Sequence, residues 1–129
     1  ILQKLLPIAQ KYAKPAISKF HVGAVAVGKT TGAIFLGGNL EFVGVPLTTC
    51  VHAEQFLIVN ARKHGEQGFD KIAITASPCG HCRQFMNEIG ESATFNIYTP
   101  NNPPTKLAEL LPQSFGPHDL GFKGGLLTT

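Results

Sequence analysis

Four side chains with the chemistry of a metal site stand at two places in the sequence. His52 and Glu54 lie two residues apart in the stretch CVHAEQ. Cys79 and Cys82 form a Cys-x-x-Cys motif in SPCGHC. Side chains at i and i+2 of a helix point to different faces, so His52 and Glu54 can share one site only from the first turn. The spacing therefore predicts a helix that begins at His52 and points its amino end at a site.

The Cys-x-x-Cys motif is compatible with two kinds of chemistry. At the start of a helix both sulfurs can reach one metal ion, and the positive end of the helix dipole favours thiolates. Thioredoxin-like redox pairs have the same spacing, so the motif alone leaves both interpretations open. His52 favours the metal, because it also stands at a predicted helix start. A His/Cys₂ ligand set with one open position is typical of catalytic zinc.

Glu54 supplies the acid–base group that such a site needs. Zinc lowers the pKa of a water that it binds, and a nearby carboxylate can take the proton and deliver it to a substrate. Taken alone, Glu54 is more simply a capping acid of the first helical turn, and His52 a helix-start residue bonded to backbone. Together with the cysteines, the pair favours catalysis. Arg83 and the helix-end dipoles are expected to offset part of the thiolate charge.

A structural zinc module without catalysis is the alternative from another class of protein. If the stretch CVH is extended, Cys50 and His52 lie on one side of it. With Cys79 and Cys82 they would complete a closed Cys₃His site. A redox protein is the third possibility.

The predicted elements bring these residues together. Apolar spacing and turn signals predict helices and strands in alternation, which indicates an α/β fold, a three-layer α-β-α sandwich with a mixed sheet. Helices that follow parallel strands open on the same edge of a sheet, where ligands collect. The predicted helices are 2–12, 52–64, one starting at 79, and 107–111; the predicted strands are 21–28, 33–42, 72–76 and 95–98, the first two forming a hairpin.

Composition narrows the class of protein. With 129 residues, 43% of them hydrophobic, the chain is the right size for one domain with a real core. The net charge of +3 comes without a block of like charges, so no nucleic-acid partner is expected. There is no apolar run of 18 residues and no signal peptide in the opening stretch, so we expect a cytoplasmic protein without membrane contact. Three cysteines argue against a disulfide framework.

The motif His52-x-Glu54 followed by Pro78-Cys79-x-x-Cys82 resembles the signature of zinc-dependent nucleoside and nucleobase deaminases. The stretches FHVGAVA, GGNLEF, CVHAEQ, PCGHCRQFMNE and LLPQSFGPHDL resemble cytidine deaminases of the homodimeric type, from about Phe20 to Asp119. This resemblance implies hydrolysis of cytidine and deoxycytidine to uridine and deoxyuridine plus ammonia, in pyrimidine salvage. It also implies one zinc per catalytic domain.

The resemblance further implies a role for individual residues. Zinc would bind His52, Cys79 and Cys82, with Glu54 as the proton shuttle. Substrate contacts would come from Phe20, which would pack on the pyrimidine, and from Asn39 and Glu41, which would bind the ribose hydroxyls. The backbone of Ala53 and the Ser77-Pro78 turn would bond the base edge and the departing ammonia. A partner subunit would contribute its Phe115.

Two related enzymes share the zinc-binding signature, and the family also implies a domain organisation. A deoxycytidylate deaminase would need a phosphate-binding site, and a tRNA adenosine deaminase would need a basic surface around its pocket. The sequence indicates neither feature. The homodimeric type carries a second, zinc-free copy of the domain, which this sequence lacks. We therefore expect residues 1–129 to be a single catalytic domain and a fragment, with an N-terminal helical segment at 1–19 and an interface tail at 99–129.

Overall fold

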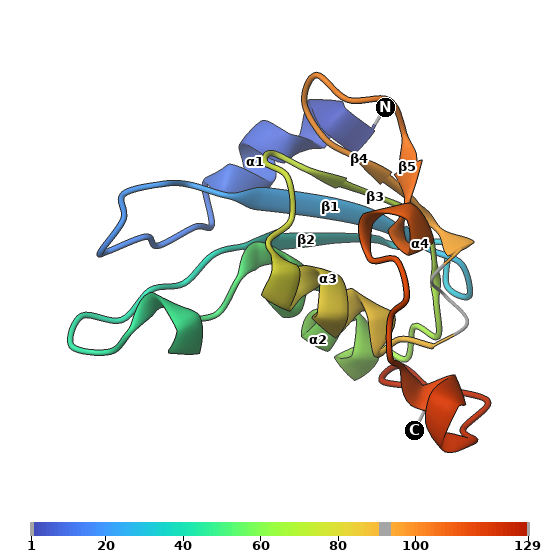
Figure 1. Ribbon diagram of the computed structural model, residues 1–129. Coiled ribbons are helices and arrows are strands. Elements are labelled where there is room, and N and C mark those ends of the chain that lie inside the picture. The colour runs from blue at the N-terminus through green and yellow to red at the C-terminus, as the bar shows by residue number, and fades with distance from the viewer. Residues whose placement is uncertain (1, 91–93, 129) are drawn as a thin grey trace.

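The computed structural model describes residues 2–90 and 94–128, which form a five-stranded mixed sheet covered by helices (Figure 1). The sheet has the order β2-β1-β3-β4-β5. Strand β1 is antiparallel to β2 and β3, β3 is parallel to β4, and β4 is antiparallel to β5. The strands are β1 (Gly23–Gly28), β2 (Ile34–Gly38), β3 (Phe69–Ile74), β4 (Asn96–Tyr98) and β5 (Thr105–Lys106).

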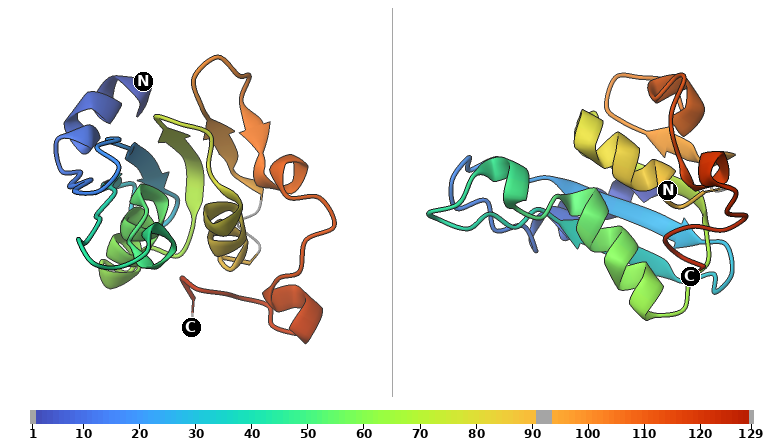
Figure 2. Two further views of the ribbon diagram at one scale, coloured as in Figure 1. Left: turned by 60° about the vertical axis from the view of Figure 1, so that its left-hand side comes forward. Right: turned by 60° about the horizontal axis from the view of Figure 1, so that its bottom comes forward.

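Helices lie on both faces of the sheet, which confirms the predicted three layers (Figure 2). A 3-10 turn at Leu2–Leu5 and helix α1 (Leu6–Gln10) cover one face. Helices α2 (Ala53–Lys63) and α3 (Gly80–Asn87) lie on the other, and the short α4 (Leu107–Leu110) follows β5. Two further 3-10 turns are Leu47–Thr49 and Pro117–Leu120. No helix in these described stretches is long and apolar enough to cross a membrane.

The alternation of β1 explains why both faces are covered. Ala24 and Ala26 belong to the larger core cluster, together with Leu57 of α2 and Met86 of α3. Val25, between them, belongs to a second cluster with residues of the N-terminal helices. Successive side chains of a strand point to opposite faces, so a strand that is apolar throughout must be buried on both.

Two consecutive glycines at the end of β2 allow two backbone segments to lie close to the sheet. A Cβ on Gly37 would stand 2.2 Å from the Ala53 carbonyl oxygen, and one on Gly38 would stand 2.7 Å from the Ala13 nitrogen. Any side chain at either position would push these backbones away. Gly37 therefore allows the amino end of α2 to lie close to β2, and Gly38 allows the segment after α1 to do the same.

The observed elements differ from the predicted ones at their ends. The second strand stops at Gly38, and Leu40 makes isolated bridges to Lys14 and Val51 instead. The first helix begins as a 3-10 turn, with proline in the first turn of α1. Strand β5 was not predicted, because two residues carry no detectable periodicity.

Glu66 closes the turn between β1 and β2 from a fully buried position. Its carboxylate accepts hydrogen bonds from the backbone N–H groups of Thr30, Thr31, Gln67 and Gly68 and from the Thr31 hydroxyl. Burial alone would raise the pKa of Glu66, but these donors outweigh it and lower the pKa to about 2. The carboxylate therefore stabilises the turn in its charged form.

Glu66→Gln is expected to lower the free energy of unfolding at pH 7 by about 1–3 kcal/mol, because the amide loses the charge and turns an NH₂ toward N–H donors. The folded-state pKa lies below the usual 4.5, so the contribution is present above that value and is lost as the pH falls toward 2. Urea unfolding at several pH values should show a steeper acid loss for the unmutated protein than for Glu66→Gln. Glu109→Gln, at an exposed position, is the matched control. Equal acid slopes for the unmutated protein and Glu66→Gln would contradict this account.

Candidate metal centre and active site

A cavity of about 280 Å³ lies where β2 and β3 end and α2 and α3 begin. Because β2 and β3 are both antiparallel to β1, they run in the same direction and end at the same edge of the sheet. The predicted convergence of the two helix starts is confirmed. The cavity is lined by Ser18, Phe20, Val22, Asn39, Glu41, Leu47, Cys50, Val51, His52, Ala53, Glu54, Ile74, Ala76, Ser77 and Cys79.

His52, Cys79 and Cys82 bring their ligand atoms together at this edge. His52 precedes α2 as its N-cap, Cys79 is the N-cap of α3, and Cys82 lies in the first turn of α3. The His52 Nδ1 atom lies 3.1 Å from Cys82 Sγ and 3.4 Å from Cys79 Sγ. All three ligand atoms fall within 4.8 Å of one another. Tetrahedral zinc with nitrogen and sulfur ligands requires N···S separations of about 3.5 Å, so the arrangement fits that ion.

The electrostatics of the cluster call for a cation. Burial, first of all, raises the pKa of the Cys82 thiol, and the nearby Glu54 carboxylate and Cys79 raise it further. A divalent cation between these groups reverses the balance, because a coordinated thiol is held as the thiolate. The donor set and its spacing therefore fit a metal ion better than a free dithiol.

Glu54 lies beside this cluster without serving as the helix cap. It is 4% exposed, lines the cavity and lies close enough to Cys82 for its charge to raise the pKa of that thiol. The reciprocal cap of α2 comes from the next residue, since Gln55 Oε1 accepts a hydrogen bond of 2.9 Å from the His52 backbone N–H. The capping interpretation of Glu54 is therefore wrong, and its carboxylate faces the site.

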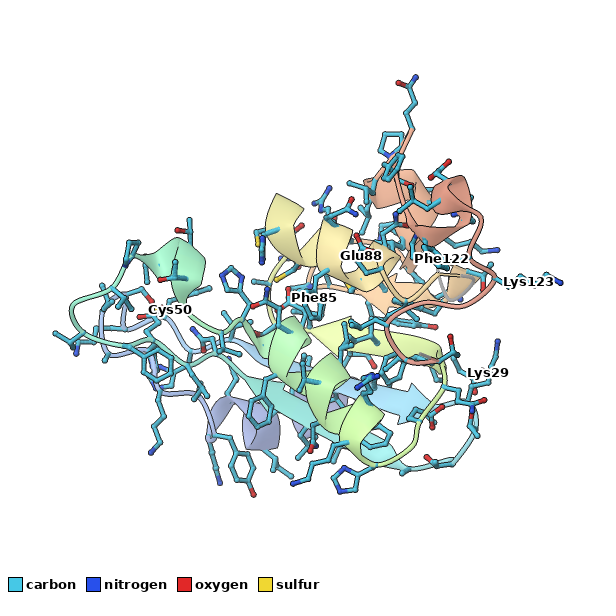
Figure 3. All side chains as sticks on the ribbon, turned by 90° about the horizontal axis from the view of Figure 1, so that it is seen from below. Lys29, Cys50, Phe85, Glu88, Phe122 and Lys123 are labelled. Atoms are coloured by element: carbon cyan, nitrogen blue, oxygen red, sulfur yellow. The ribbon has the colours of Figure 1, made fainter. Side chains whose placement is uncertain are left out.

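Cys50 does not join the cluster. It lies on the segment that leads into α2 (Figure 3). Its sulfur accepts a hydrogen bond from the Phe42 N–H at 3.4 Å and donates one to the Pro46 carbonyl at 3.6 Å. Among residues 2–90 and 94–128, the group able to hold a metal consists of His52, Cys79 and Cys82. The closed Cys₃His site is therefore not formed, and one coordination position stays open.

Five of the six predicted substrate-contact residues line the cavity: Phe20, Asn39, Glu41, Ala53 and Ser77. Phe115 does not line it. The Phe115 carbonyl accepts hydrogen bonds from Gln84 Nε2 at 2.9 Å and Asn87 Nδ2 at 3.0 Å, and the residue is 60% exposed. The side chain is therefore available to a neighbouring molecule.

The guanidinium of Arg83 holds the turn after β3. Its Nε atom donates to the Pro78 carbonyl at 2.9 Å, and its two Nη atoms donate to the Leu110 carbonyl and the Ser77 hydroxyl. From its place next to Cys82, Arg83 is expected to offset part of the thiolate charge; in the structure its hydrogen bonds fix the 77–78 turn. The sequence offered no signal for this, because Leu110 lies 27 residues away.

The fold and the site define a class of protein: an α/β domain with three metal ligands, one open coordination position and a buried carboxylate beside it. Residues 1–99 match the family model described as the cytidine and deoxycytidylate deaminase zinc-binding region. The chain belongs to this family, and zinc is the metal for which its three side chains are positioned.

Relatives and solved structures agree with this assignment. The chain is 48% identical over 124 residues to a cytidine deaminase of Vibrio vulnificus and 49% identical over 128 residues to one of Shewanella loihica. These alignments cover 96% and 99% of this chain but 42% and 43% of the relatives, so the chain spans less than half of their length. The crystal structure of cytidine deaminase from Mycobacterium tuberculosis superimposes with a TM-score of 0.79 at 29% identity, covering 89% of this chain and 94% of that one. That of Burkholderia pseudomallei gives 0.77 at 29% identity, with coverages of 88% and 96%.

Proposed function

We propose that this protein catalyses the zinc-dependent hydrolytic deamination of cytidine and deoxycytidine, which yields uridine and deoxyuridine plus ammonia. The observation that carries the proposal is the buried Glu54 carboxylate beside the His52, Cys79 and Cys82 cluster, in a cavity open to a ligand. The relatives at 48–49% identity that are named cytidine deaminase support the substrate class. A role in pyrimidine salvage follows from this reaction.

In this proposal His52, Cys79 and Cys82 hold the ion and Glu54 moves the protons. Bound zinc would lower the pKa of a water molecule toward neutrality. Water adds to C4 of the cytosine ring while Glu54 accepts one of its protons and delivers it to ring N3. Glu54 then carries the proton of the new hydroxyl to the amino group. The C4–N bond breaks, ammonia leaves, and the C4 carbonyl of uridine forms.

The other cavity residues would bind the nucleoside. Phe20 would pack on the pyrimidine, Asn39 and Glu41 would face the sugar hydroxyls, and the backbones of Ala53 and Ser77 would bond the base edge and the departing ammonia. All five line the cavity.

The charge of Glu41 favours a nucleoside over a nucleotide. Hydrogen bonds from Ser18 and Ile17 lower the pKa of the Glu41 carboxyl, against the opposing effect of burial. The group is therefore anionic at neutral pH, and an anion at the sugar end of the cavity repels a phosphate. This supports cytidine and deoxycytidine over deoxycytidylate.

We further propose a cytoplasmic homodimer in which Phe115 contacts the neighbouring subunit's bound base. The support is that Phe115 is largely exposed and lies outside its own chain's cavity, on the 99–129 segment proposed as an interface tail. Residues 1–129 would act as one catalytic domain, since both core clusters pack on a single sheet.

Sedimentation of the purified protein tests the proposed homodimer by measuring its assembly state. A monomer with full activity would contradict the dimer.

The purified protein is expected to contain about one zinc per chain and to deplete the ultraviolet absorbance of cytidine. A zinc chelator should abolish this turnover and added zinc should restore it, because the site has no other source of an acidified water. Deoxycytidine and deoxycytidylate serve as parallel substrates. Preference for deoxycytidylate would support the nucleotide deaminase instead, and a zinc-loaded protein that neither binds nor converts cytidine would refute the assignment.

A further inference from the structure

Segment 15–22 contributes Ser18, Phe20 and Val22 to the wall of the cavity. Within it Lys19 has a φ of 62°, a left-handed conformation that a lysine adopts only at a cost. Such a segment keeps one shape only when its surroundings hold it. Two side chains that follow β2, Asn39 and Glu41, hold it by hydrogen bonds.

Glu41 binds the first half of the segment. Its Oε1 atom accepts hydrogen bonds from the backbone N–H groups of Ile17 at 2.9 Å and Ser18 at 2.7 Å. Its Oε2 atom accepts a third, at 2.7 Å, from the Ser18 hydroxyl. Both carboxylate oxygens therefore bond to residues 17 and 18, and Oε2 accepts one bond fewer than Oε1.

The same Ser18 hydroxyl also holds the aromatic residue of the cavity. It accepts a hydrogen bond from the Phe20 backbone N–H at 3.1 Å. On the other side of Phe20, the carbonyl accepts from Asn39 Nδ2 at 2.8 Å, and Asn39 Oδ1 accepts from the Val22 N–H at 2.9 Å. Ser18 therefore links the Glu41 carboxylate directly to the backbone of Phe20.

The remaining hydrogen-bonding capacity points to a role in substrate binding. A carboxylate offers about four acceptor sites, two on each oxygen. The two backbone N–H groups fill those of Glu41 Oε1, and the Ser18 hydroxyl fills one of those on Oε2. One acceptor site is left for a ligand, and it is on the oxygen whose position the Ser18 hydroxyl sets.

We propose that Ser18 is a positioning residue for the nucleoside: its hydroxyl aims the free acceptor site of Glu41 at a sugar hydroxyl and sets Phe20 against the base. This inference rests on the proposed function, in which Glu41 faces the sugar. Ser18 lines the cavity but lies outside the metal cluster, so its effect falls on substrate binding and leaves the proton transfer intact.

Ser18→Ala is expected to raise KM for cytidine about tenfold, as expected for a lost hydrogen bond to a charged group, with kcat within about twofold. Zinc content and melting temperature should stay near those of the unmutated protein. Ser18→Thr keeps the hydroxyl at an exposed position and should restore most of the affinity. Failure of Ser18→Thr to bind better than Ser18→Ala would count against the proposal.

A comparison of two ligands tests whether Ser18 positions Glu41 for the sugar or only stabilises segment 15–22. In a Glu54→Gln background, which binds cytidine without consuming it, titration calorimetry gives the dissociation constants of cytidine and 2′,3′-dideoxycytidine. The loss of affinity on removing the 2′ and 3′ hydroxyls should be several-fold smaller in Ser18→Ala than in its parent, because Glu41 no longer aims its oxygen. Equal weakening of both ligands, or no weakening, would overturn the proposal while leaving the deaminase assignment intact. No binding of cytidine by the parent would instead overturn the assignment, and this inference with it.

Discussion

Glu54→Gln is expected to lower kcat for cytidine by about 10²- to 10⁴-fold while the protein keeps its zinc. Glutamine preserves the size of the side chain and its hydrogen bonding, but it cannot accept a proton from water. Stability should change little, because Gln55 and not Glu54 makes the capping bond to the start of α2. Steady-state kinetics, metal analysis and a thermal melt on the same sample measure the three quantities.

Cys50→Ser is the matched control for this prediction. Cys50 lies four residues before Glu54 and is buried, and a serine hydroxyl can make the same two bonds, from the Phe42 N–H and to the Pro46 carbonyl. The variant should keep zinc and most of the turnover. Loss of zinc in Cys50→Ser, combined with full turnover in Glu54→Gln, would show that Cys50 binds zinc and that Glu54 is not the proton carrier. That result would favour the structural zinc module.

The convergence of the metal ligands could be predicted because it depends on local signals and chain direction. His52 and Cys79 each stand at the start of a helix that follows a strand, and helix starts are visible in apolar spacing. The hairpin of β1 and β2 reverses the chain, and β3 then runs in the same direction as β2. Two helices that start after such strands open on one edge, whether or not the strands are neighbours.

The bonds between irregular segments in and around the cavity could not be predicted in this way. Ser18 and Glu41 are 23 residues apart, and Arg83 and Leu110 are 27 apart. Neither pair has a periodic pattern or a motif, because each bond depends on where two irregular segments meet in space. For the same reason the sequence predicts Asn39 and Glu41 as groups that face a sugar, and it gives no signal for their bonds to segment 15–22.

The choice between Gln55 and Glu54 as the cap of α2 shows the limit of local rules. Both residues stand in the first turn, and both side chains can reach the backbone N–H that precedes it. The capping-box rule places the reciprocal partner three residues after the N-cap, which is Gln55 when His52 is that residue. The exact start of the helix, which sequence patterns locate only within a few residues, therefore decides which side chain is free for chemistry.

Cys82→Ala is expected to abolish stoichiometric zinc binding and to lower the free energy of unfolding by about 4 kcal/mol, as when a ligand at 1,000 times its dissociation constant is removed. Cys82 is fully buried, so part of this loss comes from the missing packing of its sulfur. Cys79→Ala separates the two effects, because Cys79 is exposed and its loss leaves no comparable cavity.

The chelator provides the internal test of this prediction. It should lower the melting temperature of the unmutated protein toward that of Cys79→Ala and leave Cys79→Ala itself unchanged, since the variant has no ion to lose. Cys82→Ala should melt lower still. If the unmutated protein is instead purified without metal and forms a reversible bond between Cys79 and Cys82, the pair is redox-active. The short approach of His52 Nδ1 to both sulfurs, 3.1 and 3.4 Å, would then have to be explained without an ion between them.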